Sequence, residues 1–255
     1  MQLISKTFAA LRNLSMAIVV VLAACPAALA QITVTSATFP VAGDVLKTAI
    51  ASNPAIGIAV YTPPGGGQFW DLSGLQPGVL KNTSFQPASQ GTVGAQVPGA
   101  ELFAVPSPGS EDYYNVTANK FEIQAYYGKF YDVIPNSLAQ YSPPMVERNA
   151  PMNFFDISQS TTGIIAGSVC VPVADDGIEC SFPPSDFPPA LVAALPAQPI
   201  SLRYRVTINR LDVVDAYGTM SIPGGTYNVL RLKRTEYREI RLDGKYPPLG
   251  WLDIT

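Results

Sequence analysis

Hydrophobic and polar side chains alternate along much of this chain, and the alternation is clearest over residues 200–208. The even positions carry Ile, Leu, Tyr, Val and Ile, whereas the odd positions carry Ser, Arg, Arg and Thr. Successive side chains of a strand point to opposite faces. The pattern therefore predicts a strand with one buried and one solvated face.

Comparable patterns predict further strands, separated by Pro and Gly. These segments are residues 32–35, 44–50, 57–61, 68–72, 101–105, 112–116, 121–127 and 226–242. One row of side chains in the last segment is charged in its middle, so we predict two strands with a bend near Arg234. Pairs of adjacent prolines, such as residues 143–144, and the Asp243-Gly244 dipeptide predict loops or turns.

These elements predict an all-β fold, with two antiparallel sheets packed as a sandwich. Residues 188–195 predict one short helix in a connection, because a proline starts the segment and Pro196 ends it. Residues 84–100 are low in charge and rich in small side chains, and we expect an exposed loop there.

The first thirty residues have the layout of a cleavable signal peptide. Residues 1–13 are basic, residues 14–24 form an apolar run, and small side chains precede Gln31. The run is shorter than the roughly 20 residues that a membrane-spanning helix needs. We expect a signal helix over residues 1–30, an extracytoplasmic domain over 31–255, and no later membrane span. An alternative is an envelope lipoprotein, since residues 22–25 resemble a lipobox that would place a lipid on Cys25.

Composition excludes several classes of function. Residues 1–30 hold Lys6 and Arg12 of the 16 basic residues and none of the 19 acidic ones, so the mature chain carries 14 basic against 19 acidic side chains. A net negative chain does not favour nucleic-acid binding. The absence of histidine excludes Ser-His-Asp and Cys-His catalysis and histidine-bound zinc. We expect no metal and no cofactor. Because the chain ends in an apolar, strand-like run, we expect it to be part of a longer protein.

Two cysteines remain after cleavage, Cys170 and Cys180. Asp176-Gly177 between them favours a tight turn, which would bring the cysteines opposite one another in a hairpin. In an oxidising compartment we expect a disulfide. A metal pair or a redox pair is the alternative, although the spacing differs from Cys-x-x-Cys. Asp175 and Asp176 fall short of a calcium shell.

Two kinds of side chain are candidates for function. Carboxylates could pair as in glycoside hydrolases, and the candidates are Glu111, Asp112, Glu122, Asp212, Asp215 and Glu236. Aromatic side chains could instead bind a ligand, and the candidates are Tyr113, Tyr114, Tyr126, Tyr127 and Tyr131. Adjacent tyrosines in a strand point to opposite faces, so core packing competes with the binding interpretation.

Three segments carry a resemblance to a family: residues 38–44 (TFPVAGD), 66–75 (GGQFWDLSGL) and 224–234 (GGTYNVLRLKR). Together they resemble the N-terminal region of uncharacterised bacterial secreted proteins that often end in a type IX secretion sorting domain. The resemblance implies a secreted or cell-surface protein and no particular activity. We therefore expect a non-catalytic β module that serves adhesion, binding or structure, with an extracellular glycan or another surface protein as partner. The alternative is a carbohydrate-active enzyme that uses paired carboxylates.

Overall fold

The computed structural model describes residues 32–50, 62–76, 78–130, 134–173, 177–195 and 198–254. The strands are β1 (Val45–Ile50), β2 (Gly65–Asp71), β3 (Val79–Pro87), β4 (Leu102–Ala104), β5 (Glu111–Val116), β6 (Lys120–Phe130), β7 (Ile134–Asn149), β8 (Ile157–Gly167), β9 (Val169–Val173), β10 (Gly177–Ser181), β11 (Ser201–Ile222), β12 (Gly225–Tyr246) and β13 (Gly250–Asp253). The helices are α2 (Pro189–Ala194) and the single 3-10 turns η2 (Ser36–Thr38), η3 (Ala88–Gln90), η4 (Gly94–Gln96) and η5 (Pro184–Asp186). The predicted all-β class with one short helix in a connection is confirmed.

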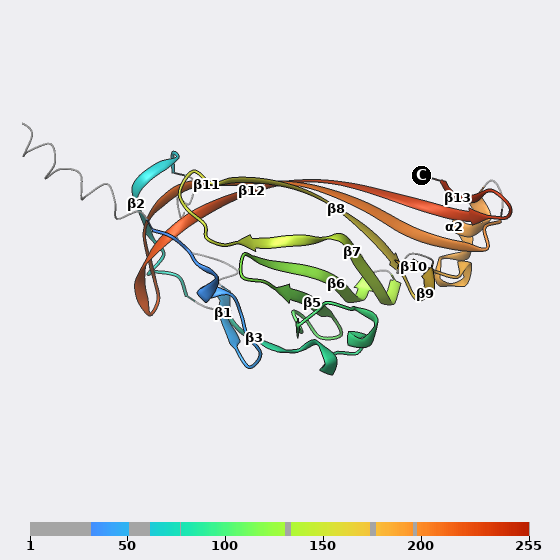
Figure 1. Ribbon diagram of the computed structural model, residues 1–255, viewed down its shortest axis with the longest axis horizontal. Coiled ribbons are helices and arrows are strands. Elements are labelled where there is room, and N and C mark those ends of the chain that lie inside the picture. Colours follow the sequence, from blue (N-terminus) through green and yellow to red (C-terminus); the bar gives the residue numbers. More distant parts are fainter. Residues whose placement is uncertain are drawn as a thin grey trace, which may run out of the picture.

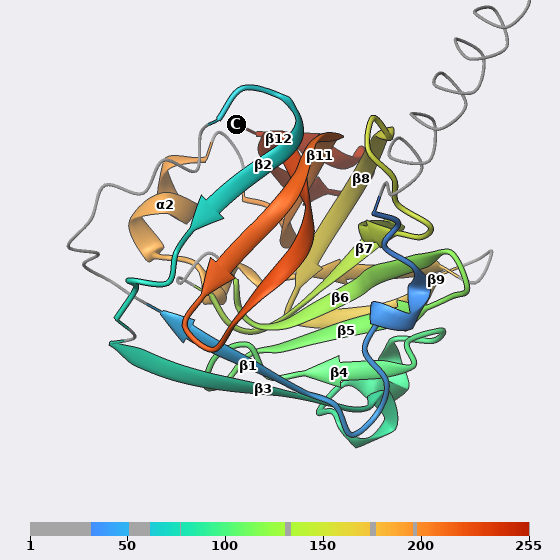
Figure 2. The ribbon, with the colours of Figure 1, turned by 90° about the vertical axis from the view of Figure 1, so that its left-hand side faces the viewer.

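Eleven of the described strands form one sheet, in the order β1-β3-β4-β5-β6-β7-β8-β11-β12-β13, with β2 added in parallel beside β11. All other neighbours are antiparallel. Figure 1 shows β8 and the long β11 and β12 arching over β5, β6 and β7. Figure 2 shows the strands following one another around a curl, with α2 on its open side.

In place of the two separate sheets of a sandwich, the described strands form this single curled sheet and the small β9–β10 ribbon. The long β11–β12 hairpin explains the difference, because its two 22-residue strands stay paired along their whole length. A bulge between Val214 and Ala216 takes the place of the predicted bend near Arg234. The turn predicted at Asp243-Gly244 is wrong, since both residues lie inside β12.

The sheet divides between β7 and β8. The two strands pair only through Leu138–Ser142 and Gly163–Gly167, and then separate. Residues 143–144, predicted as a loop, lie inside β7 at this point. Their missing N–H groups break no ladder, because β7 has already left β8 and is bulged against β6 there.

Buried side chains form three clusters. The largest lies between the middle of the sheet and the connection that holds α2, and Phe182, Phe187, Leu202 and Val206 belong to it. A second cluster lies beneath residues 88–97. In the third cluster, Phe39 packs against side chains of β3, β4 and β6. As predicted, the even positions of β11 face the core: Leu202, Val206 and Ile208 are buried.

Several predictions fall outside the described residues. They are the signal peptide, Cys25, the strand over 57–61, Tyr131 and the turn residues Asp175 and Asp176. None of the described helices has the length and apolarity that crossing a membrane requires.

Candidate ligand-binding site

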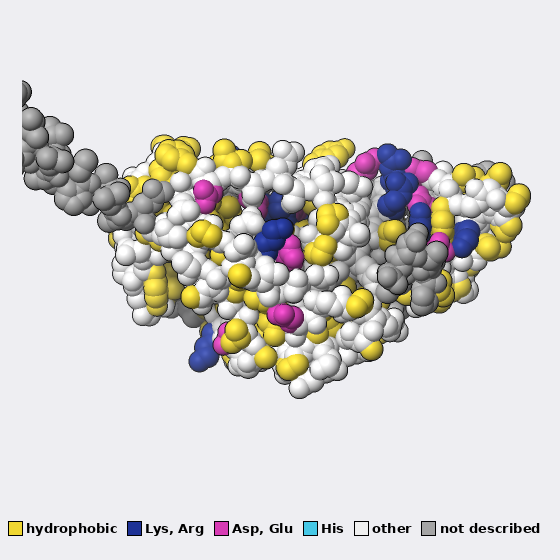
Figure 3. Space-filling model, in the orientation of Figure 1, with side chains coloured by type: hydrophobic (Ala, Val, Ile, Leu, Met, Phe, Trp, Pro, Cys, Tyr) yellow, Lys and Arg dark blue, Asp and Glu magenta, His cyan; other side chains and the backbone are white. Residues whose placement is uncertain are grey.

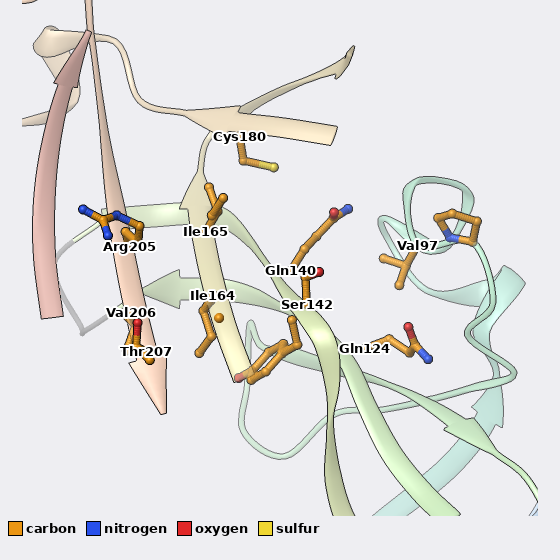
Figure 4. Close-up of a pocket in the computed structure, with 13 residues that line it drawn as sticks. Val97, Gln124, Gln140, Ser142, Ile164, Ile165, Cys180, Arg205, Val206 and Thr207 are labelled. Carbon is orange, nitrogen blue, oxygen red and sulfur yellow. The ribbon is translucent and has the colours of Figure 1, made fainter. Parts of the chain in front are cut away.

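A hollow of about 550 Å³ lies where β6, β7, β8 and β11 run side by side, next to the η4 turn. Its lining residues are Val97, Pro98, Gln124, Gln140, Tyr141, Ser142, Gly163, Ile164, Ile165, Cys180, Arg205, Val206 and Thr207. Figure 4 shows Gln140 pointing into the space between Cys180 and Val97. The lining thus joins amide and hydroxyl side chains to a few aliphatic ones.

The only charged side chain among these lining residues is Arg205. Its Nε and Nη2 donate to the two carboxylate oxygens of Asp243, at 3.0 and 2.9 Å. These hydrogen bonds raise the pKa of Arg205. Burial opposes the charged form of Asp243, but the hydrogen bonds from Arg205 and Arg203 lower its pKa overall. The cation at the hollow therefore has its counter-ion in place, and an anionic ligand is not required.

Residues 88–100 are held against the sheet by specific hydrogen bonds. Gln140 Nε2 donates to the Gln96 carbonyl at 3.1 Å. Thr92 donates its N–H and its hydroxyl to the Glu111 carboxylate, at 2.9 and 2.7 Å. The Val93 N–H donates to the Tyr113 hydroxyl at 3.0 Å. The predicted exposed loop is therefore a fixed wall of the hollow.

The disulfide between Cys170 and Cys180 is confirmed. The two residues are directly opposite in the β9–β10 ribbon, with their Cα atoms 4.0 Å apart. Cys180 is buried and lines the hollow, so the disulfide fixes a second wall.

The candidate tyrosines do not gather on one exposed face. Tyr113 has no exposed surface and stacks on Phe103, and its hydroxyl donates to Glu111. Tyr114 points to the other face and stacks on Phe121, with ring centres 4.7 Å apart. Burial raises the pKa of both phenols.

The two tyrosines of β6 are only partly buried, and each packs against a different core. Tyr126 contacts the largest cluster and donates to the Lys129 carbonyl at 3.1 Å. Tyr127 packs against the cluster beneath residues 88–97. None of the candidate tyrosines in the described residues lines the hollow.

Three of the six candidate carboxylates, Asp212, Asp215 and Glu236, are bound by arginine. Arg234 donates to both oxygens of Asp212, at 2.9 and 3.0 Å, and Arg231 donates to both oxygens of Asp215, at 2.7 and 3.1 Å. Glu236 accepts from Arg210 and Arg238, whose hydrogen bonds lower its pKa against the effect of burial. Figure 3 shows charged side chains in the middle of one face of the molecule and again toward β13.

Glu147 joins two of these pairs, and no sequence motif marks it. Its carboxylate lies 3.2 Å from Arg210 Nη1 and 3.1 Å from Arg234 Nη1. The same arginines donate to the carbonyls of Val146 and Glu147, at 2.6 and 2.8 Å. Both carbonyls belong to the part of β7 that has left β8. The arginines thus cross the gap in the sheet.

Asp112 differs from these carboxylates, because no arginine binds it. Its partner is the Tyr114 hydroxyl, 3.1 Å from Oδ2. Burial is the main cause that raises its pKa to about 6, and the negative charge of Glu147 adds to the rise. The hydrogen bond from Tyr114 opposes it. Asp112 and Glu147 are thus the two carboxyl groups that a hydrolase interpretation would use, but neither lines the hollow.

In the part of the chain that the structure describes, no three Cys, Asp or Glu side chains come together as a metal site would need. No protein-family model matches the chain, and comparisons with curated proteins and with solved structures gave no match.

Proposed function

We propose that the chain is an extracytoplasmic, non-catalytic binding module whose hollow beside residues 88–100 holds a segment of an uncharged glycan. The observation that carries the proposal is the lining of the hollow. Gln124, Gln140, Ser142 and Thr207 offer amide and hydroxyl groups, while Val97 and Ile165 offer aliphatic surface. Such a mixture matches the hydroxyl groups and C–H surfaces of sugars.

The disulfide supports the proposed location. Disulfides form and persist in oxidising compartments outside the cytoplasm, and this one forms a wall of the hollow. Mass spectrometry of the exported protein tests the location and the mode of cleavage together. We expect a mature N-terminus at Gln31, and a diacylated Cys25 would establish the lipoprotein alternative.

Binding is favoured over hydrolysis because of the side chains that the described residues place around the hollow. A glycoside hydrolase needs two carboxyl groups about 5–10 Å apart, and none of the described residues that line the hollow carries a carboxylate. The second candidate, an enzyme that uses Asp112 and Glu147, is supported by the pKa of about 6 at Asp112. It requires a substrate to reach Asp112, which is mostly buried.

The proposal can be tested with a panel of neutral and acidic polysaccharides. Binding is detected by affinity electrophoresis and then measured by calorimetry. We expect at least one neutral glycan to bind. Gln140→Leu and Thr207→Val each remove hydrogen-bonding groups with little change of volume, and we expect each to weaken binding about fivefold. Gln159→Leu on the exposed face of β8 is the matched control and is expected to change nothing.

Two results would decide against this proposal. If the glycan affinity is the same in Gln140→Leu, Thr207→Val and the control, the hollow is not the site. If the protein releases reducing sugar from a polysaccharide and Asp112→Asn abolishes the release, the enzyme alternative is correct.

A further inference from the structure

Arg148 is exceptional among the arginines that the structure describes. Each of the others has a carboxylate oxygen within 4.0 Å, and Arg148 has none. It donates one hydrogen bond, from Nη2 to the Thr38 carbonyl at 3.2 Å. Its guanidinium carbon lies 5.4 and 5.6 Å from the ring centres of Phe39 and Phe121. Burial lowers the pKa of this side chain.

Arg148 lines a second hollow, of about 220 Å³, which lies beside the gap between β7 and β8. Two carboxylates, Asp156 and Asp212, line it as well. Asp212 is neutralised by Arg234. Asp156 accepts from the Asn153 N–H at 2.6 Å and from its side-chain amide at 3.4 Å, and it forms no ion pair with any described residue. Among the described residues, neither Arg148 nor Asp156 has an oppositely charged atom within 4.0 Å, although the negative charge of Glu147 favours the charged form of Arg148 from a greater distance.

The rest of the lining is mainly apolar. Pro151, Met152, Ile157, Val214 and Leu232 contribute aliphatic surface. The polar pair Asn149 and Ser158 is joined by its own hydrogen bond, 3.3 Å long. Sites for drug-sized ligands have volumes of about 300–1,000 Å³. This hollow is smaller, so it suits a smaller molecule.

We propose that this hollow binds a small zwitterion, a free α-amino acid with an apolar side chain. The ligand carboxylate would accept from Arg148, whose planar fork matches a carboxylate. The ligand ammonium would lie at Asp156, and the aliphatic surface would contact the ligand side chain. A simple anion would be repelled by Asp156, and a simple cation by Arg148. The proposal is independent of glycan binding, since the two hollows share no lining residue.

Calorimetry with three ligands tests it on the purified protein: leucine, leucinamide, which lacks the carboxylate, and N-acetyl-leucine, which lacks the ammonium. We expect leucine to bind most tightly. Leucinamide should bind about tenfold more weakly, because it loses a charge-assisted contact with a partly buried arginine. N-acetyl-leucine should bind about threefold more weakly, because Asp156 is exposed and its ion pairs are screened.

Two variants assign the charges. Arg148→Gln should bind leucine and leucinamide equally, and Asp156→Asn should bind leucine and N-acetyl-leucine equally. Arg238→Gln, which removes an exposed arginine elsewhere, is the matched control and should retain both preferences.

The three ligands tested on the unaltered protein decide the proposal even where a variant fails to fold. It is overturned if all three bind alike, or if leucine gives no signal at about 10 mM. It is also overturned if folded Arg148→Gln still prefers leucine over leucinamide.

Discussion

Replacing Asp112 by Asn should stabilise the protein, and the gain should depend on pH. The pKa of Asp112 is raised from 3.8 to about 6 in the folded chain. The difference corresponds to about 3 kcal/mol of stability that is lost when the carboxyl is ionised in both states. The amide of Asn carries no charge to desolvate, and its oxygen still accepts from the Tyr114 hydroxyl.

The direction with pH follows from proton linkage. Above pH 6 the Asp112 carboxyl is ionised in both the folded and the unfolded chain, and it lowers the free energy of unfolding by the full amount of about 3 kcal/mol. Between pH 6 and pH 4 the folded chain takes up the proton first, so the cost falls as the pH is lowered. From the two pKa values we expect the Asn variant to be more stable by about 3 kcal/mol at pH 7.5 and by about 1 kcal/mol at pH 4.5.

Urea unfolding followed by tryptophan fluorescence at both pH values measures this difference. Glu122→Gln is the matched control, because that carboxylate has only a 3.5 Å ion pair with the exposed Lys120. We expect the control to change stability by less than about 0.5 kcal/mol at either pH. An Asp112→Asn gain that is equal at the two pH values, or a loss at pH 7.5, would refute the reasoning.

Three further predictions concern stability. Arg210→Met removes the donor of the Val146 carbonyl and one of the two arginine partners of Glu147 and of Glu236, and urea unfolding should show a loss of about 2 kcal/mol; an unchanged midpoint would contradict the bridging role. Replacing Cys170 and Cys180 together by Ala opens a loop with a sequence separation of 10, and the protein should lose about 3 kcal/mol, measured against the oxidised and the reduced parent. Gly167→Ala places a methyl group 2.0 Å from the Ser181 backbone nitrogen, so thermal unfolding should begin at a clearly lower temperature, whereas Gly163→Ala, whose methyl group would lie 3.2 Å from the Ser142 carbonyl oxygen, should lower it much less.

The sequence predicted the strands whose pairing is local or whose faces differ strongly. β11 is the best example, because its alternation continues for many residues and one face meets the main core. The turn before β12 and the cysteine pair were also predictable. In each case the signal lies within a few residues, as Gly224 with its φ of 105° or the opposed cysteines show.

The missed features depend on distant partners. β7 passes through Pro143, which is tolerated because no strand needs its N–H at that point. Gly244 looks like a turn residue, yet it serves close packing: a methyl group there would lie 2.8 Å from the Tyr246 ring. A short sequence window contains neither fact.

The candidate sites show the same limit. Glu147 gains its importance from Arg210 and Arg234, which are 63 and 87 positions away in the chain. The glycan hollow is composed of ordinary Gln, Ser and Thr side chains that no motif marks. Of the segments that the sequence analysis describes as loops, residues 84–100 contribute Val97 and Pro98 to its lining.

Two kinds of interaction join β7 to the strands beyond the gap. At the Leu138–Ser142 end, backbone hydrogen bonds pair β7 with β8, and at the Glu147 end, ion pairs with Arg210 and Arg234 connect β7 to β11 and β12. Salt screens the more exposed ion pair between Arg234 and Glu147 more than the pair between the buried Arg210 and Glu147, and it hardly affects the backbone hydrogen bonds. Raising the ionic strength should therefore weaken the contact between β7 and β12 at Glu147 first. The backbone pairing of β7 with β8, and the hollow beside residues 88–100, should stay intact. The hollow beside residues 88–100 would in this way stay rigid as the salt concentration changes.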